Sequence, residues 1–339
     1  MKVVLYIVSI LSVAIIISSC EKDVILDITP GAEDAVVEAW IYNNSGPLVM
    51  LSKQFSGYGT FNTATLTDEL NVKNAVVLVS ENNGSPIQLA QKSIFDLPID
   101  LLEQVLDANR FPRAAAPAIA LLSGFTLEQQ LSFAQSTEDT ALIRLLNNFN
   151  FYIDTSNTII GQGGASYQLQ ISKEDIALFA ETTMPISQGI NFLSYTIADD
   201  NPNLAQVKMN LTVPNNYDAF VLLATSRNQD PFYIPDYLGG GLSDNGIYAG
   251  SGTITLPLLR GYGDNEDVEI ADLGLFELGD TVTLKWQNID EATYNFWFSV
   301  FNDGGDTPFS TATKIQSNVE NGFGIWAAYN TTYTTIILD

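Results

Sequence analysis

Short segments in which apolar and polar residues alternate recur from Val36 to the end of the chain, and they limit the fold more than any other feature. A period of two places successive side chains on opposite faces of a β-strand, so each segment has one face to bury. Gly, Asn and Pro residues separate the segments. The pattern predicts a mainly β fold built as antiparallel sandwiches or barrels. The predicted strands are 36–42, 48–53, 74–80, 86–92, 166–171, 206–213, 219–225, 247–256, 281–286, 294–301 and 332–338.

Two turn segments predict hairpins. The sequence NNSGP occupies 43–47, after the first strand, and ENNG occupies 81–84, between the third and fourth strands. Asn and Gly accept the positive φ angles that tight hairpin turns require. We therefore expect the strands on either side of each turn to pair with one another.

Residues 94–151 interrupt the alternation. Leu97, Leu101, Leu102 and Val105 have the spacing of one helical face, and a capping box (TLEQ) lies at 126–129. The segment predicts a small all-helical insertion in a loop of the first of two domains. We expect an Ig-like β-sandwich at 36–183 that contains this insertion, and an antiparallel β domain at 184–339.

The first 35 residues differ from the rest of the chain. Lys2 is followed by an almost unbroken apolar run, Val3 to Ile17, and then by SSC at 18–20. A helix over this run would be about 22 Å long, shorter than the ~30 Å hydrocarbon core of a bilayer, so a signal peptide fits better than a membrane span.

Cys20 is the only cysteine in the chain, and it follows a small residue and an aliphatic one at lipobox spacing. The sequence therefore predicts removal of 1–19, lipidation of Cys20 and a tether over 20–35. The alternative is an ordinary cleaved signal in which Cys20 has no role.

The charge of the chain limits its partners. Removal of 1–19 leaves 13 basic residues against 39 acidic ones, a net charge of −26. Such a chain repels phosphate groups, which excludes nucleic acid as a partner. Hydrophobic residues make up 46% of the sequence, enough to build a core, so disorder is not expected.

Histidine is absent from the sequence. This excludes Ser-His-Asp and Cys-His catalysis and the usual zinc sites, and lipidation of Cys20 removes thiolate chemistry. A carboxylate pair of the kind that glycoside hydrolases use is the remaining catalytic option, and the sequence singles out no such pair. We therefore expect a non-catalytic protein.

Calcium is the one metal for which the sequence offers ligands, because hard cations prefer carboxylate and carbonyl oxygens. Neither acidic segment has the ligand spacing of an EF-hand loop, and an acidic turn without a metal is the alternative for both. No other cofactor is expected. The candidate ligands are Asp264, Glu266, Asp267, Asp303 and Asp306.

Two aromatic segments are candidates for a surface that binds a ligand or partner. In the predicted strand 294–301, two rings lie on the face opposite the predicted core, where they could stack on a sugar or dock a partner; packing under a loop is the alternative. The loop 230–241 combines aromatic rings with three successive glycines, which suits a lid or a receptor contact; a loop packed on itself is the alternative. The candidate residues are Trp297, Phe301, Phe232, Tyr233 and Tyr237.

The C-terminal region is the most distinctive part of the sequence. It contains GDTV at 279–282, PF at 308–309, NG at 321–322 and GIWAAY at 324–329, and the front of the chain has CEK at 20–22, VEAWI at 37–41 and GASYQL at 164–169. In order and spacing these motifs resemble an uncharacterised family of Bacteroidota outer-membrane lipoproteins. The resemblance covers 20–93 and 160–339.

The resemblance implies a lipid-anchored protein of the outer membrane, exposed at the cell surface or, alternatively, on the periplasmic face. Members of such a family are often encoded beside SusC-like TonB-dependent receptors. The implied role is that of a non-catalytic accessory subunit for nutrient capture or uptake with such a receptor. A surface adhesion or structural module and a carboxylate-based hydrolase are the alternatives, and the resemblance supplies no catalytic residue.

Overall fold

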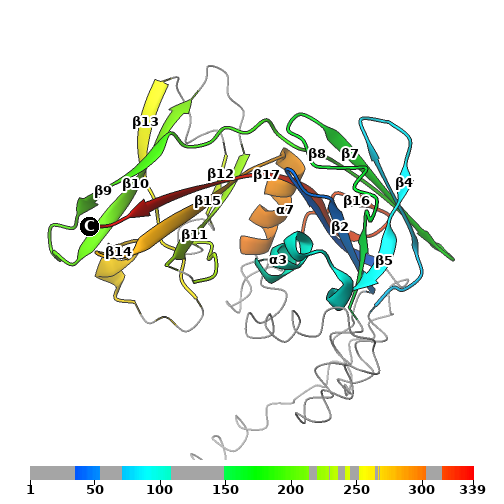
Figure 1. Ribbon diagram of the computed structural model, residues 1–339, viewed down its shortest axis with the longest axis horizontal. Helices are drawn as coiled ribbons and strands as arrows, with labels where there is room; N and C mark the ends of the chain where they lie inside the picture. Colours follow the sequence, from blue (N-terminus) through cyan, green and yellow to red (C-terminus); the bar gives the residue numbers. More distant parts are fainter. Residues whose placement is uncertain are drawn as a thin grey trace, which may run out of the picture. The chain divides into compact units, whose positions relative to one another are not determined.

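The computed structural model describes residues 35–53, 71–107, 149–213, 220–228, 230–235, 241–244, 252–263, 266, 268–302 and 315–339. All of them belong to one compact unit, Asp34–Asp339 (Figure 1). Within these residues the chain forms three β-sheets and two α-helices, so the predicted mainly β fold is confirmed. The predicted signal peptide, the tether and Cys20 lie outside the described residues.

The largest sheet has eight strands in the order β12-β11-β15-β17-β1-β2-β6-β5. Four of the strands precede residue 184 and four follow it, so the predicted domain boundary runs through one sheet. The predicted β1–β2 hairpin is confirmed, with Val37 opposite Leu51. The strands are β12 (Leu242–Ser243), β11 (Phe220–Arg227), β15 (Thr281–Ile289), β17 (Phe323–Ile337), β1 (Ala35–Tyr42), β2 (Pro47–Lys53), β6 (Asn150–Ile153) and β5 (Ala90–Ser93).

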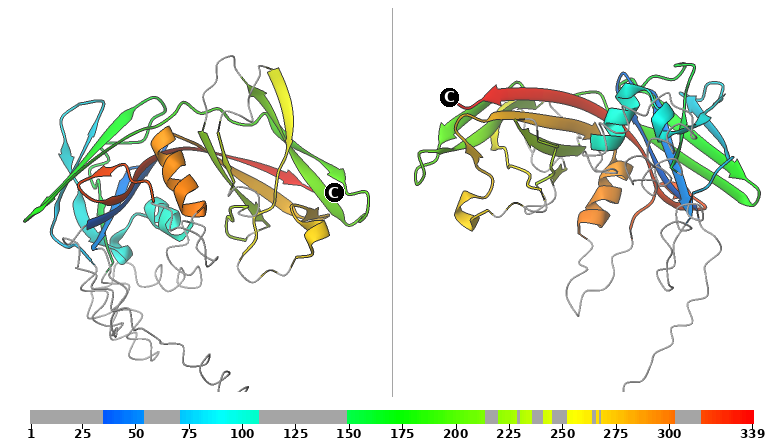
Figure 2. Two further views of the ribbon diagram at one scale, coloured as in Figure 1. Left: turned by 180° about the vertical axis from the view of Figure 1, so that it is seen from behind. Right: turned by 60° about the horizontal axis from the view of Figure 1, so that its bottom comes forward.

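Strand β17 connects the two halves of this sheet (Figure 2). Its first half pairs with β1, from Phe323 opposite Val36 to Tyr329 opposite Tyr42, and its second half pairs with β15. The β1–β17 pairing is parallel, whereas the predicted sandwiches were antiparallel. Alternation places each strand but encodes neither its partner nor its direction, and these two strands come from opposite ends of the chain.

A five-stranded sheet covers one part of the eight-stranded sheet. Val37 and Ile41 of β1 pack with Val77 and Leu169 from this sheet in a shared core. Trp326 of β17 is fully buried in that core. The sheet order is β16 (Val319–Glu320), β8 (Ile176–Thr183), β7 (Ser166–Lys173), β3 (Val76–Glu81) and β4 (Ile87–Gln88).

The β3–β4 hairpin is confirmed, and Asn82 and Asn83 in its turn have φ angles of 49° and 59°. The predicted strand 86–92 is nevertheless divided between two sheets. Its first part is β4, whereas β5 crosses to the eight-stranded sheet and pairs with β6.

A second small sheet covers the other part of the eight-stranded sheet. Val207 and Leu211 of this sheet pack with Leu284 and Trp286 of β15 in a separate core. Its strands are β13 (Gly252–Pro257), β10 (Leu204–Val213), β14 (Phe276–Glu277) and β9 (Phe192–Ile197), with β9 paired to β10, and the 3-10 helix η5 (Ile270–Asp272) precedes β14.

The helices pack on the opposite face of the eight-stranded sheet. Residues of even number in β17, such as Trp326 and Ile336, enter the cores beneath the two small sheets, whereas Ile325 and Tyr329 belong to a third core that contains the helices. Both small sheets therefore cover one face of the large sheet. The elements on the other face are η1 (Ile94–Asp96), α3 (Ile99–Asp107) and α7 (Glu291–Phe301).

The predicted helical insertion is confirmed where the structure describes it. Residues 94–96 and 99–107 are helical, and Leu101, Leu102 and Val105 are buried as their spacing predicts. Residues 108–148 lie outside the described residues. The predicted end at 151 is slightly late, because β6 begins at Asn150.

The predicted strand 294–301 is wrong, because these residues form α7. Asp290 caps the helix by accepting a hydrogen bond from the backbone of Thr293. Tyr294, Trp297 and Phe301 also have the three- and four-residue spacing of a helical face, which the alternating apolar pattern concealed. None of the helices in the described part of the chain is long and apolar enough to cross a bilayer.

Candidate functional site

Helix α7 holds two of the predicted site residues, Trp297 and Phe301, and Asp290 fixes its position. One carboxylate oxygen of Asp290 accepts from Thr293 N at 2.8 Å, and the other accepts from Thr182 Oγ1 at 2.7 Å and Thr183 N at 3.0 Å. The start of the helix is thereby tied to β8, and its aromatic side packs on the eight-stranded sheet.

The rings of α7 continue onto the sheet. The rings of Trp297 and Phe301 are stacked with their centroids 5.5 Å apart, and Trp297 Nε1 donates to Tyr329 Oη at 2.9 Å. Tyr329 stacks at 5.1 Å on Tyr42, its register partner in the parallel β1–β17 pair. The unpredicted parallel pairing is what brings these two tyrosines together.

A buried lysine extends the row of rings. Lys285 of β15 is only 6% exposed, and its Nζ lies 5.3 Å from the centroid of Tyr42 and 5.7 Å from that of Phe232. The negative faces of aromatic rings attract an ammonium group at such distances. Phe232 in turn contacts Tyr333 at 5.6 Å. We call this continuous row the aromatic belt; its members are Phe301, Trp297, Tyr329, Tyr42, Lys285, Phe232 and Tyr333.

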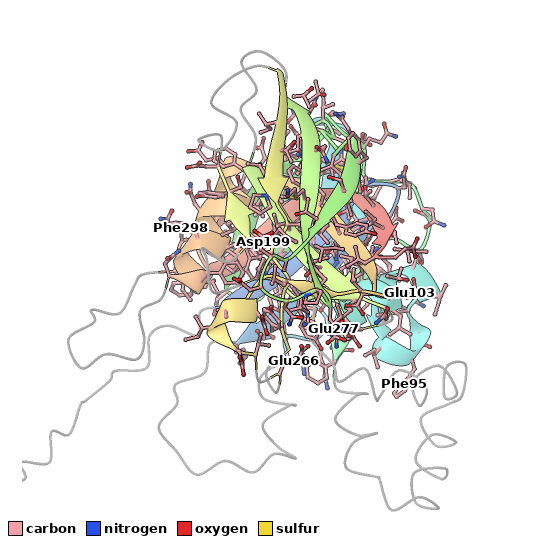
Figure 3. All side chains as sticks on the ribbon, turned by 90° about the vertical axis from the view of Figure 1, so that its left-hand side faces the viewer. Phe95, Glu103, Asp199, Glu266, Glu277 and Phe298 are labelled. Atoms are coloured by element: carbon pink, nitrogen blue, oxygen red, sulfur yellow. The ribbon has the colours of Figure 1, made fainter. Side chains whose placement is uncertain are left out.

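Apolar side chains are exposed at both ends of the aromatic belt. On the α7 side, Phe298 is 46% exposed (Figure 3). Ile315 is also 46% exposed. The chain at Ile315 lies against the helix, because the N–H of the next residue, Gln316, donates to Ser299 Oγ. On the β17 side, Tyr333 is 55% exposed and Ile337 58% exposed. Large apolar side chains left in water at two ends of one aromatic row are typical of a binding surface.

Burial also sets the ionisation of the tyrosine nearest the helix start. Burial raises the pKa of Tyr294, and the negative charge of Asp244 raises it further. Its ring packs between Phe220 and Phe298, at 5.0 and 5.8 Å. Both effects favour the neutral phenol, and Tyr294 packs here as an aromatic ring.

The structure unites three of the five predicted surface residues, since Trp297, Phe301 and Phe232 all belong to the aromatic belt. Tyr233 does not: its backbone exchanges two 2.9 Å hydrogen bonds with Thr225, and its ring lies against Gly263. Tyr237 lies outside the described residues. Four members of the belt were not predicted from the sequence, although three of them, Tyr42, Lys285 and Tyr333, lie in predicted strands. The missed members are Tyr42, Tyr329, Tyr333 and Lys285.

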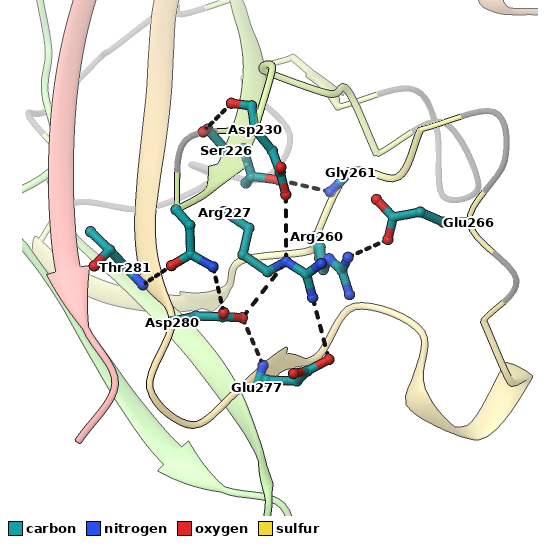
Figure 4. Close-up of polar contacts among 11 residues, drawn as sticks. Ser226, Arg227, Asp230, Arg260, Gly261, Glu266, Glu277, Asp280 and Thr281 are labelled. Carbon is teal, nitrogen blue, oxygen red and sulfur yellow. Dashed lines mark hydrogen bonds and ion pairs between the residues drawn. The ribbon is translucent and has the colours of Figure 1, made fainter.

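Of the calcium candidates, the structure describes Glu266 alone. Its carboxylate forms an ion pair with Arg260 (Figure 4). The guanidinium of Arg260 also lies 4.6 Å from the centroid of the Tyr262 ring. Glu266 thus faces a cation from the protein itself. The described residues contain no group of three or more metal-ligating side chains, and Asp264, Asp267, Asp303 and Asp306 lie outside them. Calcium binding stays a prediction.

A second arginine, Arg227, forms ion pairs at the start of the loop that carries Phe232. Arg227, at the end of β11, contacts the carboxylates of Asp230, Glu277 and Asp280 at 3.6, 3.3 and 4.0 Å (Figure 4). Asp280 also accepts from Asn228 Nδ2 at 3.0 Å. These contacts hold the start of the loop against Glu277 of β14 and Asp280, and so help to position the Phe232 end of the aromatic belt.

One family model covers nearly the whole chain. A model described as Domain of unknown function (DUF4249) matches residues 21–335. The chain belongs to the DUF4249 family. The match contains every residue of the aromatic belt, so in this DUF4249 chain the belt lies inside the family region. Neither a curated protein nor a solved structure matches the chain.

Proposed function

We propose that this DUF4249 chain is a non-catalytic binding subunit of the bacterial cell envelope, anchored by a lipid at Cys20. Its role is to assist a TonB-dependent outer-membrane transporter in capturing or importing a nutrient. The observation that carries the proposal is the aromatic belt, which gathers rings from β1, the loop at 230–235, α7 and β17 on one face and leaves apolar side chains exposed at both ends.

The composition of this surface suits a protein partner. Interface centres are enriched in aromatic residues and depleted in charged ones, and tyrosine and tryptophan are frequent energetic hot spots. In a chain with 39 acidic residues, the exposed α7 end presents Phe298 and Ile315. We propose that this end contacts the transporter.

The anchor follows from the N-terminal sequence. A lipobox that ends in the only cysteine of the chain supports lipidation of Cys20. Acyl chains contribute about 0.8 kcal/mol per buried CH₂, so two or three chains give stable membrane attachment. The motifs shared with Bacteroidota lipoproteins support an outer-membrane location, exposed at the cell surface, beside a SusC-like receptor.

Co-purification tests this function. The tagged full chain is isolated from mildly crosslinked, detergent-solubilised membranes of its own organism, and captured proteins are identified by mass spectrometry. We expect a TonB-dependent β-barrel with the wild type and less of it with Phe298→Ala. The matched control is Phe192→Ala, which removes a ring that is 54% exposed on β9, and it should capture as much as the wild type. A chain recovered alone would contradict the proposal.

A further inference from the structure

Beside the aromatic belt, β15 and β17 form a regular array on the same face of the large sheet. Tyr333, Thr335 and Ile337 lie directly opposite Lys285, Thr283 and Thr281, and in each strand alternate residues share a face. Thr335 is exposed, as are Tyr333 and Ile337, whereas Thr281 and Thr283 are half-buried. We call the outer part of this array the threonine face; it consists of Thr281, Thr283, Tyr333, Thr335 and Ile337.

The threonine face combines an aromatic ring with a pair of hydroxyl groups. The Oγ1 atoms of Thr283 and Thr335 are 3.0 Å apart, and either can donate to the other. Each hydroxyl therefore keeps capacity for a further hydrogen bond. The ring of Tyr333 packs against that of Phe232, with the ring centroids 5.6 Å apart, and Tyr333 is still 55% exposed. An exposed ring beside hydroxyls complements a sugar, which has C–H groups on one face of its ring and hydroxyls at its edge.

The charges around the threonine face distinguish between neutral and acidic ligands. Residues 329–337 contain no charged side chain in a chain of net charge −25. The cationic side chains of β15 and of the neighbouring strand β11 are both engaged: Arg227 contacts three carboxylates, and Lys285 is only 6% exposed beneath two rings. An acidic sugar would meet the negative field of the whole chain without an exposed cation on β11, β15 or β17 to neutralise it. The chemistry therefore favours an uncharged ligand.

We propose that the threonine face binds a neutral oligosaccharide. The ring of Tyr333 stacks on one sugar ring, and the hydroxyls of Thr283 and Thr335 form hydrogen bonds with the hydroxyls of the next. From Tyr333 to Ile337 the strand extends about 13 Å, which suits an oligosaccharide better than a single sugar. The proposal rests on the proposed function, because it names the class of nutrient that the binding subunit holds.

Titration calorimetry of the full chain in detergent tests the proposal. The probes are cellohexaose, xylohexaose, mannohexaose and maltohexaose, with oligogalacturonate as the acidic comparison. We expect at least one neutral probe to bind and the acidic one not to bind. Tyr333→Ala should weaken binding by about ten-fold or more through loss of the stacking ring, and Thr335→Val, which removes only the hydroxyl, by about three-fold or more.

The matched control is again Phe192→Ala, which should bind as the wild type does. Circular dichroism and melting of each variant confirm that it is folded. Absence of binding to every neutral probe would overturn the proposal, and so would binding that Tyr333→Ala and Thr335→Val leave unchanged. A transporter captured by a chain that binds no sugar would refute this inference while leaving the proposed function intact.

Discussion

At the scale of single residues, Asp154 is the most heavily hydrogen-bonded buried carboxylate in the described part of the chain. It is 6% exposed and accepts from the backbone N–H groups of Ser156, Thr158 and Ile159 at 2.8, 2.6 and 2.9 Å, and from Ser156 Oγ at 2.5 Å. Burial raises the pKa of Asp154, but the hydrogen bonds together outweigh burial, and the net effect lowers the pKa below its ordinary 3.8. The ionised carboxylate thus holds the loop after β6 in place.

This lowered pKa predicts how stability depends on pH. The contribution of Asp154 is complete above the pKa of the unfolded chain, 3.8, and is lost as the pH falls through the lower pKa of the folded state. Asp154→Asn should therefore lower the free energy of unfolding by about 1–3 kcal/mol at pH 7, and by less at pH 3. Urea titrations at both pH values measure the difference, and an equal loss at pH 7 and pH 3 would contradict the assignment.

Gly324 is a second position where one residue decides local structure. Its φ is +109°, and a Cβ there would collide with the carbonyl of Val37, its register partner in β1. Gly324→Ala should therefore reduce the free energy of unfolding by more than the roughly 1–3 kcal/mol of backbone strain alone. The control is Gly252→Ala, where φ is +117° but the space is open. Equal losses in urea titrations of the two variants would show that the close approach of β1 to β17 adds nothing to the cost of Gly324→Ala.

At the scale of elements, local chemistry was readable from the sequence and long-range pairing was not. The β1–β2 and β3–β4 hairpins follow from alternation and from Asn residues that accept positive φ. By contrast, nothing local indicates that β5 leaves β4 to pair with β6, or that β1 pairs in parallel with β17. Those choices depend on which strands bury their apolar faces together, a property of the assembled sheets.

Helix α7 shows how an aromatic run can mislead. Alternating rings favoured a strand, but the side chain of Asp290 stabilises the first turn of a helix, and this local hydrogen bond marks the true start. The cap was visible in the sequence, since Asp290 stands four residues before Tyr294, the first ring. A capping aspartate followed by rings at three- and four-residue spacing indicates a helix, even where apolar residues also alternate.

Removal of this cap should disturb the aromatic belt. Asp290→Ala loses the Thr293 cap, about 0.5–2 kcal/mol for such a residue, and also leaves Thr182 Oγ1 and Thr183 N without their carboxylate acceptor. We expect a lower free energy of unfolding and a shift in tryptophan emission, because Trp297 lies on α7. Asp199→Ala, in an exposed loop, is the control and should change stability by less than about 0.5 kcal/mol. Unchanged tryptophan emission from Asp290→Ala would show that the Asp290 cap does not help to position the aromatic belt.

At the scale of the whole molecule, the candidate site could be predicted only in part. The sequence pointed to Trp297, Phe301 and Phe232 because aromatic residues cluster around them. Their union through Tyr42, Tyr329 and Lys285 depends on three strands that are neighbours only in the folded sheet. The composition of a segment identifies candidate side chains, whereas their convergence is decided by tertiary packing.

Membrane attachment also belongs to the whole molecule. Since acyl chains on Cys20 are the proposed anchor, Cys20→Ala should move the chain from the membrane fraction to the soluble fraction or halt its processing. Fractionation and metabolic labelling with a fatty-acid analogue measure both effects, with Lys22→Ala as the control that keeps the lipobox. Undiminished membrane attachment of Cys20→Ala would rule out the lipid anchor.

The central claim is that the face bearing the aromatic belt is where this chain meets its transporter. Site-specific photocrosslinking in native membranes tests it most directly, with a benzophenone amino acid at Phe298 and, as control, at Phe192. Both rings are substantially exposed, and they lie on different elements, α7 and β9. The account predicts an adduct with a TonB-dependent β-barrel from position 298 and none from position 192. No adduct at 298, or the same adduct from both positions, would contradict it.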